Sequence, residues 1–229
     1  GERVLPQGSG RTDAGVHASG QVASFSLAAP IPPANFQRAL NRVLPPSIRV
    51  LTAEHASTDF HARHRAVGKV YRYRIFHGAI CPPFLARYVT CTPWALDLGA
   101  MQQAALAILG EHDFTSFAAV DPDRNARLQQ DSQNPETPSN LRRIDQSQWS
   151  CESAEFSGVD SINTQIFTYI VRGNGFLHHM VRNLVGTFIE VGRGKIAPTM
   201  MAAILTGRDR TLAGPTAPAC GLCLMRVLY

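Results

Sequence analysis

The alternation of apolar and polar side chains predicts four strands along the chain. Short segments rich in β-branched and aromatic residues, with a two-residue period, are typical of strands. In the segment 69–76, Lys69, Tyr71, Tyr73 and Ile75 share one face, so basic side chains flank a pair of tyrosines. The four segments are residues 21–27, 69–76, 161–172 and 222–229.

A longer apolar period predicts four helices. The first is stopped by a pair of prolines and the second by Gly110. The clearest is the third, whose apolar stripe contains Leu184 and Phe188. Strands and helices mixed at hairpin-like spacing predict an α+β fold with an antiparallel sheet. The helices are expected at residues 36–44, 97–109, 176–190 and 198–206.

The composition is that of a globular protein. The chain has 229 residues, of which 45% are hydrophobic and 17% charged, and this length is sufficient to bury a core. It contains no run of 18 apolar residues, so we expect no membrane span. The first residues lack the layout of a signal peptide, and we therefore expect a cytoplasmic protein.

The charge is unevenly distributed. The formal net charge is +5, and residues 60–96 contain no acidic side chain. A basic stretch of this kind favours contact with a polyanion such as nucleic acid, with a solvated basic face as the alternative. Its cations are Arg63, Arg65, Lys69, Arg72, Arg74 and Arg87.

The sequence offers no metal-binding pattern. The five cysteines are scattered, and Cys220 and Cys223 form half of a zinc motif without a second half. His178 and His179 are adjacent, so on a helix their side chains would point about 100° apart. We therefore expect no catalytic metal.

A polar segment interrupts the predicted elements. Residues 121–140 contain Pro122, Pro135 and Pro138 and few apolar side chains. We interpret this segment as a long mobile loop within the fold rather than a linker between domains.

The opening segment contains the first candidate for chemistry. Asp13 follows Arg11 in a loop bounded by Gly10 and Gly15, which let the backbone bend and leave room for a bulky ligand. An arginine of this kind keeps a carboxylate ionised and binds phosphate. A turn with a surface ion pair is the alternative interpretation.

Two further candidates lie on predicted elements. Tyr71 stands beside cations, an arrangement that suits stacking of a nucleic-acid base, although sheet aromatics also pack in cores. Arg182 lies off the apolar stripe of the helix at 176–190, where it either reaches a cleft or is simply solvated.

Together these segments resemble the TruA branch of the pseudouridine synthases. The run GRTDAGVHA at residues 10–18 is close to a family identifier, and the later pieces follow in the family's order. They are DFHAR at 59–63, KVYRY at 69–73, GEHDFTSF at 110–117, GFLHHMVRN at 175–183 and GL at 221–222.

The resemblance implies the roles of several residues. Asp13 corresponds to the essential aspartate, Arg11 to its neighbour, and Arg182 to the arginine that pairs with it. Tyr71 corresponds to the stacking tyrosine and Leu222 to an apolar residue of the uracil pocket. The implied reaction is isomerisation of uridines to pseudouridine in the anticodon stem-loop of tRNA, by a homodimer that uses no cofactor.

The resemblance also implies the organisation of the chain. The family fold has two α/β subdomains whose antiparallel sheets join, which we expect at residues 1–65 and 66–229. Family members carry roughly fifty residues before the GRTD motif, so we expect an N-terminally truncated chain. Two alternatives remain, an RNA-binding protein without catalysis and a pseudouridine synthase acting on another RNA. In the implied reaction Asp13 acts either as a nucleophile at C1′ of the ribose or as a base at C2′.

Overall fold

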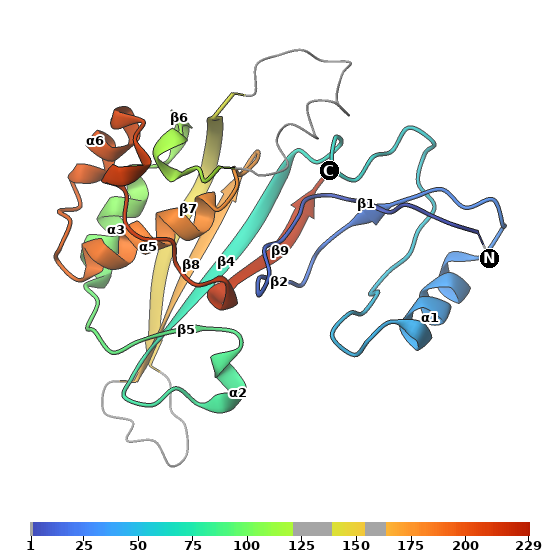
Figure 1. The fold of residues 1–229 in the computed structure, drawn as a ribbon, viewed down its shortest axis with the longest axis horizontal. Coiled ribbons are helices and arrows are strands. Elements are labelled where there is room, and N and C mark those ends of the chain that lie inside the picture. Colours follow the sequence, from blue (N-terminus) through green and yellow to red (C-terminus); the bar gives the residue numbers. More distant parts are fainter. Residues whose placement is uncertain (1, 121–138, 154–163) are drawn as a thin grey trace. The chain divides into compact units, whose positions relative to one another are not determined.

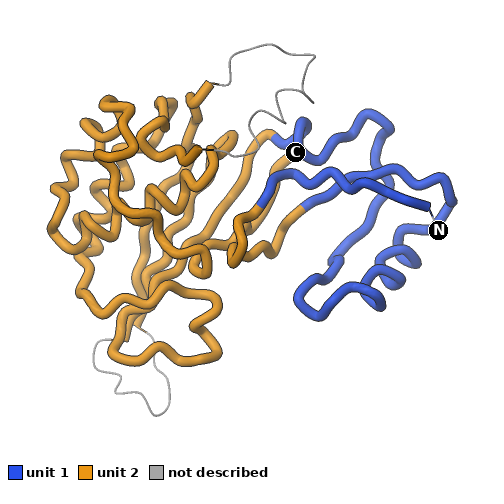
Figure 2. Tube along the Cα trace, in the orientation of Figure 1, with its two compact units in different colours: residues 1–11, 22–66 blue, residues 12–21, 67–229 orange. Residues whose placement is uncertain are grey.

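The chain divides into two compact units. The structure is a computed structural model that describes residues 2–120, 139–153 and 164–229 (Figure 1). One unit comprises residues 1–11 and 22–66, and the other comprises residues 12–21 and 67–229 (Figure 2). The loop that carries Asp13 therefore belongs to the second unit, although the first unit flanks it on both sides in sequence.

The first unit contains a short two-stranded sheet. Strands β1 (Gln7–Gly8) and β3 (Ala23–Ser24) pair antiparallel, with Gln7 opposite Ser24. A strand was predicted over residues 21–27, but β3 is only two residues long. A strand is hydrogen-bonded only along the length of its partner strand, and the partner, β1, is also two residues long.

Helix α1 (Pro33–Val43) confirms the helix predicted at residues 36–44. A proline occupies its first turn, where backbone amides have no acceptor within the helix, so the lack of an N–H costs no hydrogen bond. The side chain of Asn41 ties this helix to the segment that follows it. Its Nδ2 donates to the carbonyl oxygen of Val50, and its Oδ1 accepts from the Val50 amide, both at 2.8 Å.

The second unit is built on a mainly antiparallel sheet. Among the described residues its strands follow the order β2–β9–β4–β8–β7–β6, and β5 pairs with β4. Only the β2–β9 and β4–β5 pairs are parallel. This confirms the predicted α+β class. The bounds are β2 (His17–Ala18), β4 (Gly68–His77), β5 (Thr90–Thr92), β6 (Gly110–Asp113), β7 (Leu141–Ser153), β8 (Gln165–Gly173) and β9 (Leu222–Leu228).

Helices cover one face of this sheet (Figure 1). They are α3 (Leu98–Leu106), α5 (Met180–Gly192) and α6 (Met200–Gly207), and they confirm three predicted helices. A four-residue helix α2 (Pro83–Ala86) lies between β4 and β5. Within the described residues, none of the helices is long and apolar enough to cross a membrane.

An aromatic cluster fixes α5 on the sheet. Trp149 of β7 stacks on Tyr169 of β8 with ring centroids 4.9 Å apart. Phe188 of α5 meets both rings edge-on, at 6.1 and 5.3 Å. All three side chains are almost fully buried. Such pairs contribute beyond their buried area, and they hold in place the helix that carries Arg182.

The start of α5 differs from the prediction. The helix was expected to begin at residue 176 but begins at Met180. His179 adopts the left-handed conformation, with φ of 57°, and this interrupts the right-handed helical path. His178 and His179 consequently lie outside the helix.

Parts of two predicted elements lie outside the described residues. These are residues 121–138 of the polar segment at 121–140, and residues 161–163 of the strand predicted at 161–172. The described part of that strand forms β8.

Candidate active site

The loop that carries Asp13 is anchored on β9. Strand β2, which follows the loop in the sequence, pairs parallel with β9, with His17 opposite Cys223. The amide of Val16 donates to the carbonyl oxygen of Asp13 at 3.0 Å and closes a turn. Gly15 within this turn has a φ of 85°, a conformation that favours glycine. The sequence therefore forms a tight turn that presents Asp13 at the sheet edge formed by β2 and β9.

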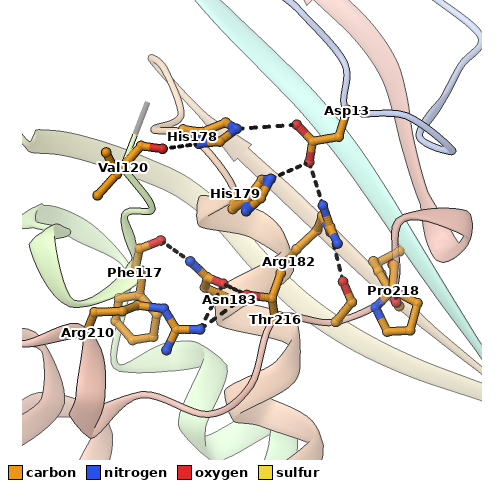
Figure 3. Close-up of polar contacts among 12 residues, drawn as sticks. Asp13, Phe117, Val120, His178, His179, Arg182, Asn183, Arg210, Thr216 and Pro218 are labelled. Carbon is orange, nitrogen blue, oxygen red and sulfur yellow. Dashed lines mark hydrogen bonds and ion pairs between the residues drawn. The ribbon is translucent and has the colours of Figure 1, made fainter. Parts of the chain in front are cut away.

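Arg182 approaches the same carboxylate from α5 (Figure 3). Its Nη1 atom donates to Oδ2 of Asp13 at 2.6 Å, and its Nε donates to the carbonyl oxygen of Ala217 at 2.8 Å. The two side chains are only 15% and 27% exposed, so water screens their attraction weakly. A hydrogen bond between two charged groups is among the stronger kinds in proteins.

Two histidines also lie beside the Asp13 carboxylate (Figure 3). Nε2 of His179 lies 3.2 Å from Oδ2, and Nε2 of His178 lies 3.7 Å from Oδ1. Their ring centroids are 3.9 Å apart. The expectation that these side chains diverge was wrong, because it assumed a helix where His179 is left-handed.

Burial lowers the pKa of His179. The negative charge of Asp13 raises this pKa and so opposes the effect of burial. The positive charges of Arg182 and Arg210, and the imidazole of His178, lower it further. His179 is therefore neutral at neutral pH and carries a single ring proton.

Tyr71 of β4 is electrostatically coupled to Asp13. Burial, followed by the negative charge of Asp13, raises the pKa of Tyr71 to about 12. Its ring meets Phe176 edge-on with centroids 5.1 Å apart. Leu222, the first residue of β9, is 6% exposed and lies opposite Tyr73 in the ladder with β4. Tyr71 and Leu222 thus lie on neighbouring strands.

The sequence-predicted residues are not all placed in one unit. Asp13, Arg182, Tyr71 and Leu222 belong to the second compact unit, whereas Arg11 belongs to the first. The carboxylate, its arginine partner and the coupled tyrosine form one electrostatic group within the second unit.

A polar network behind Arg182 was not anticipated from the sequence (Figure 3). The fully buried Asn183 donates from Nδ2 to the carbonyl oxygen of Phe117 at 2.7 Å. Its Oδ1 accepts from Thr216 at 2.7 Å and from Arg210 at 3.1 Å. A buried amide with all these partners fixes the helix relative to the segment that contains Ala217. The only sequence signal was a polar residue inside an otherwise apolar helix.

Asp13, His178 and His179 form a group with the ligand types of a metal site. One atom from each of them lies within 4.8 Å of the others. However, the guanidinium of Arg182 already occupies Oδ2 of Asp13. A metal cation at this position would stand beside a fixed positive charge, which disfavours its binding. We therefore interpret the group as a carboxylate with cationic and imidazole partners.

Comparisons with known proteins identify the class. Residues 104–229 match the family model described as tRNA pseudouridine synthase. The chain is 46% identical to "tRNA pseudouridine synthase A" of Solibacter usitatus, over all of this chain and 84% of that protein. It is 43% identical to the protein of that name in Moorella thermoacetica, over all of this chain and 83% of the relative.

The chain is thus an isomerase of the pseudouridine synthase class. Within that class, it belongs to the tRNA pseudouridine synthase A family. A third relative of the same name, from Bacillus pumilus, is 41% identical over 96% of this chain and 80% of its own length. The resemblance first seen in the run GRTDAGVHA is confirmed.

Proposed function

We propose that this protein converts uridines in the anticodon stem-loop of tRNA to pseudouridine, with Asp13 as the catalytic carboxylate. The observation that carries the proposal is the different surroundings of the two oxygen atoms of this carboxylate. Arg182 donates to Oδ2 at 2.6 Å, and Nε2 of His178 lies 3.7 Å from Oδ1, beyond the distance of an ordinary hydrogen bond. We take Oδ1 as the oxygen that reacts.

The reaction requires a positioned carboxylate. Uridine is joined to ribose through N1, and pseudouridine through C5, so one glycosidic bond breaks and a carbon–carbon bond forms. An ionised carboxylate acts either as a nucleophile at C1′ or as a base that removes the proton from C2′. Oδ1 of Asp13 is suited to both roles, and the geometry favours neither.

The neighbouring residues support this carboxylate. Arg182 orients the Asp13 carboxylate through a hydrogen bond between charged groups, and its second hydrogen bond, to Ala217, holds the guanidinium in place. Tyr71 offers a ring on which the flipped uracil stacks, and Leu222 offers an apolar edge to the pocket. Arg11 contributes a positive charge for the RNA backbone next to the catalytic loop.

The substrate proposal also rests on charge and on family membership. A net charge of +5 and a basic stretch at residues 60–96 suit a folded RNA, whose backbone attracts arginine and lysine. A uridine in a stem must leave its stack before it reaches Asp13, at a cost of a few kcal/mol. Family membership favours a homodimer acting on tRNA in the cytoplasm.

A substrate comparison tests this proposal. The protein is incubated separately with unmodified tRNA and with ribosomal RNA, both carrying tritium at C5 of uridine, and released tritium is counted. We expect release from tRNA alone, at positions within the anticodon stem-loop. Release from ribosomal RNA alone would indicate another RNA substrate, and tight tRNA binding without release would indicate a non-catalytic binding protein.

A further inference from the structure

An aromatic and basic surface lies on the segment between β4 and β5, and a direct contact joins it to the strand that follows Asp13. Its exposed side chains are Phe84, Arg87 and Tyr88. We infer that this surface binds the tRNA strand beside the reacting uridine, with Tyr88 stacking on a base and Arg87 pairing with a phosphate. This inference rests on the proposed function and extends the RNA-binding surface beyond the catalytic group.

A short helical turn presents these side chains. Helix α2 continues through Arg87, whose backbone is also in the right-handed helical region. The amide of Tyr88 then donates to the carbonyl oxygen of Leu85 at 2.7 Å. Residues four positions apart on such a turn lie on the same side. Phe84 and Tyr88 therefore stand next to each other on one side of the turn.

The other side of the turn is fixed on the sheet. Leu85 packs against a small hydrophobic cluster, separate from the main core, that consists of Phe76, Val89 and Ile166. Figure 1 shows α2 apart from the helices α3, α5 and α6. Because Leu85 is held inside, the rings of Phe84 and Tyr88 remain outside, 67% and 49% exposed. Large aromatic side chains gathered on one exposed turn are typical of a binding surface.

His17 fastens this turn to the catalytic loop. Its Nε2 lies 2.7 Å from the carbonyl oxygen of Arg87, and Nε2 is the donor because a carbonyl oxygen only accepts. Its ring packs against the ring of Tyr88, with centroids 4.8 Å apart. His17 comes four positions after Asp13, and four residues span at most about 14 Å, the length of a few stacked nucleotides. An RNA strand whose uridine reaches Asp13 can therefore extend to this surface.

The charge of the segment favours RNA as the occupant. Residues 60–96 contain no Asp or Glu, so this stretch brings no carboxylate to compete for Arg87. Arginine binds phosphate through two parallel hydrogen bonds, and an aromatic ring stacks on any base. A second copy of this chain is a poorer occupant. A twofold interface centred on the surface would bring the two copies of Arg87 together, and like charges oppose such pairing.

The test measures the affinity of the protein for unmodified tRNA at several salt concentrations. Tyr88→Ala should weaken binding roughly 5- to 150-fold, as loss of one stacked base does, with an unchanged dependence on salt. Tyr88→Phe keeps the ring and should recover most of this loss. Phe84→Ala leaves the ring contact between His17 and Tyr88 in place and should also weaken binding.

Arg87→Ala tests the phosphate contact separately. The variant should bind tRNA more weakly, and the slope of log affinity against log salt concentration should fall by about one, as loss of one phosphate contact predicts. The hydrogen bond from His17 is retained, because it is made to the backbone carbonyl oxygen of residue 87.

Trp94→Ala is the matched control. Trp94 is 51% exposed, close to the value for Tyr88, but the guanidinium of Arg193 already covers its ring at 3.6 Å from the centroid. Arg193 caps the end of α5, roughly 16 Å along the helix from Arg182. This variant should bind tRNA with wild-type affinity.

A Tyr88→Ala variant that binds tRNA as tightly as Trp94→Ala would overturn the inference, and so would an unchanged salt slope for Arg87→Ala. The oligomeric state of each free variant is measured by analytical ultracentrifugation. Loss of affinity that accompanies dissociation of a wild-type oligomer would assign the surface to a second copy instead. Failure of the proposed function is recognised separately, in a wild-type protein that binds tRNA but releases no tritium from C5-labelled uridine.

Discussion

Arg182 and Asp13 lie 169 positions apart in the sequence and meet through a 2.6 Å hydrogen bond. The pairing joins α5 to the turn before β2, so the site is assembled from segments that are far apart in the sequence of the second unit. Because Arg182 also donates to Ala217, its guanidinium is held on both sides. The orientation of the Asp13 carboxylate thus depends on tertiary packing.

Replacing Arg182 by alanine should slow the reaction less than replacing Asp13. The substitution removes a hydrogen bond between charged groups, worth about 1.5–3 kcal/mol, and leaves the carboxylate in place. We expect the single-turnover rate to fall by roughly 10- to 100-fold, since each 1.36 kcal/mol is a factor of ten. Arg182→Lys keeps the charge and should recover part of this loss. An alanine variant as slow as Asp13→Asn would show that Arg182 itself takes part in the chemistry.

Asn183→Ala should destabilise the fold. It removes the donor to the carbonyl oxygen of Phe117 and the acceptor for Thr216, and it takes one of several partners from Arg210. One buried unsatisfied group costs about 1–3 kcal/mol. Urea unfolding should therefore show a lower midpoint at an unchanged slope.

A surface threonine offers the control for that experiment. Thr206 is exposed, and its hydroxyl donates to the carbonyl oxygens of Ala202 and Ala203 within its own helix, α6. Thr206→Ala should leave the urea midpoint close to that of the wild type. An equal loss of stability in both variants would mean that the network around Asn183 contributes little.

Three strands of the second unit, β4, β8 and β9, followed from local patterns, whereas the longest strand, β7 (Leu141–Ser153), and the site did not. β4 and β9 were predicted because side chains alternate between the two faces of a strand, so a strand with one buried face has apolar residues at every second position. The left-handed residue His179 was missed, because a single φ angle leaves no trace in an apolar period. Its effect is large, since it brings two histidines to the same carboxylate.

The site residues came from the family resemblance rather than from periodicity. No local pattern relates Asp13 to Arg182, because their contact depends on how β2 joins β9 and how α5 packs. Asn183 was overlooked for a different reason. A polar residue in a helix is usually solvated, and only the tertiary structure reveals that its partners surround it in the core.

The tyrosine beside the site should make stability sensitive to alkali. Burial, followed by the negative charge of Asp13, raises the pKa of Tyr71 from its ordinary value of 10.0 to about 12. A raised pKa in the folded state means that the unfolded chain loses its proton first. The stabilisation is therefore complete below pH 10 and is lost as the pH rises toward 12.

Tyr71→Phe isolates this contribution. The variant keeps the ring against Phe176 and should bind tRNA with near wild-type affinity. Its unfolding free energy should decline less steeply than that of the wild type between pH 10 and 12. Identical pH dependence in the two proteins would show that the Tyr71 hydroxyl is not buried in solution.

The assignment of Asp13 as the catalytic carboxylate is tested most directly by Asp13→Asn. The substitution is nearly isosteric, so folding and tRNA affinity should be retained while the charge and the nucleophile are lost. Asp145→Asn is the matched control, because the ion pairs of Asp145 within the described part of the chain are with Arg143 and Arg172, away from Asp13. This control should react at the wild-type rate.

The measurement is single-turnover release of tritium from C5-labelled uridine in tRNA, with tRNA affinity determined in parallel. We expect Asp13→Asn to bind tRNA normally and to release tritium several orders of magnitude more slowly than the wild type, as loss of an essential nucleophile does. Normal binding together with wild-type release would contradict the assignment of Asp13.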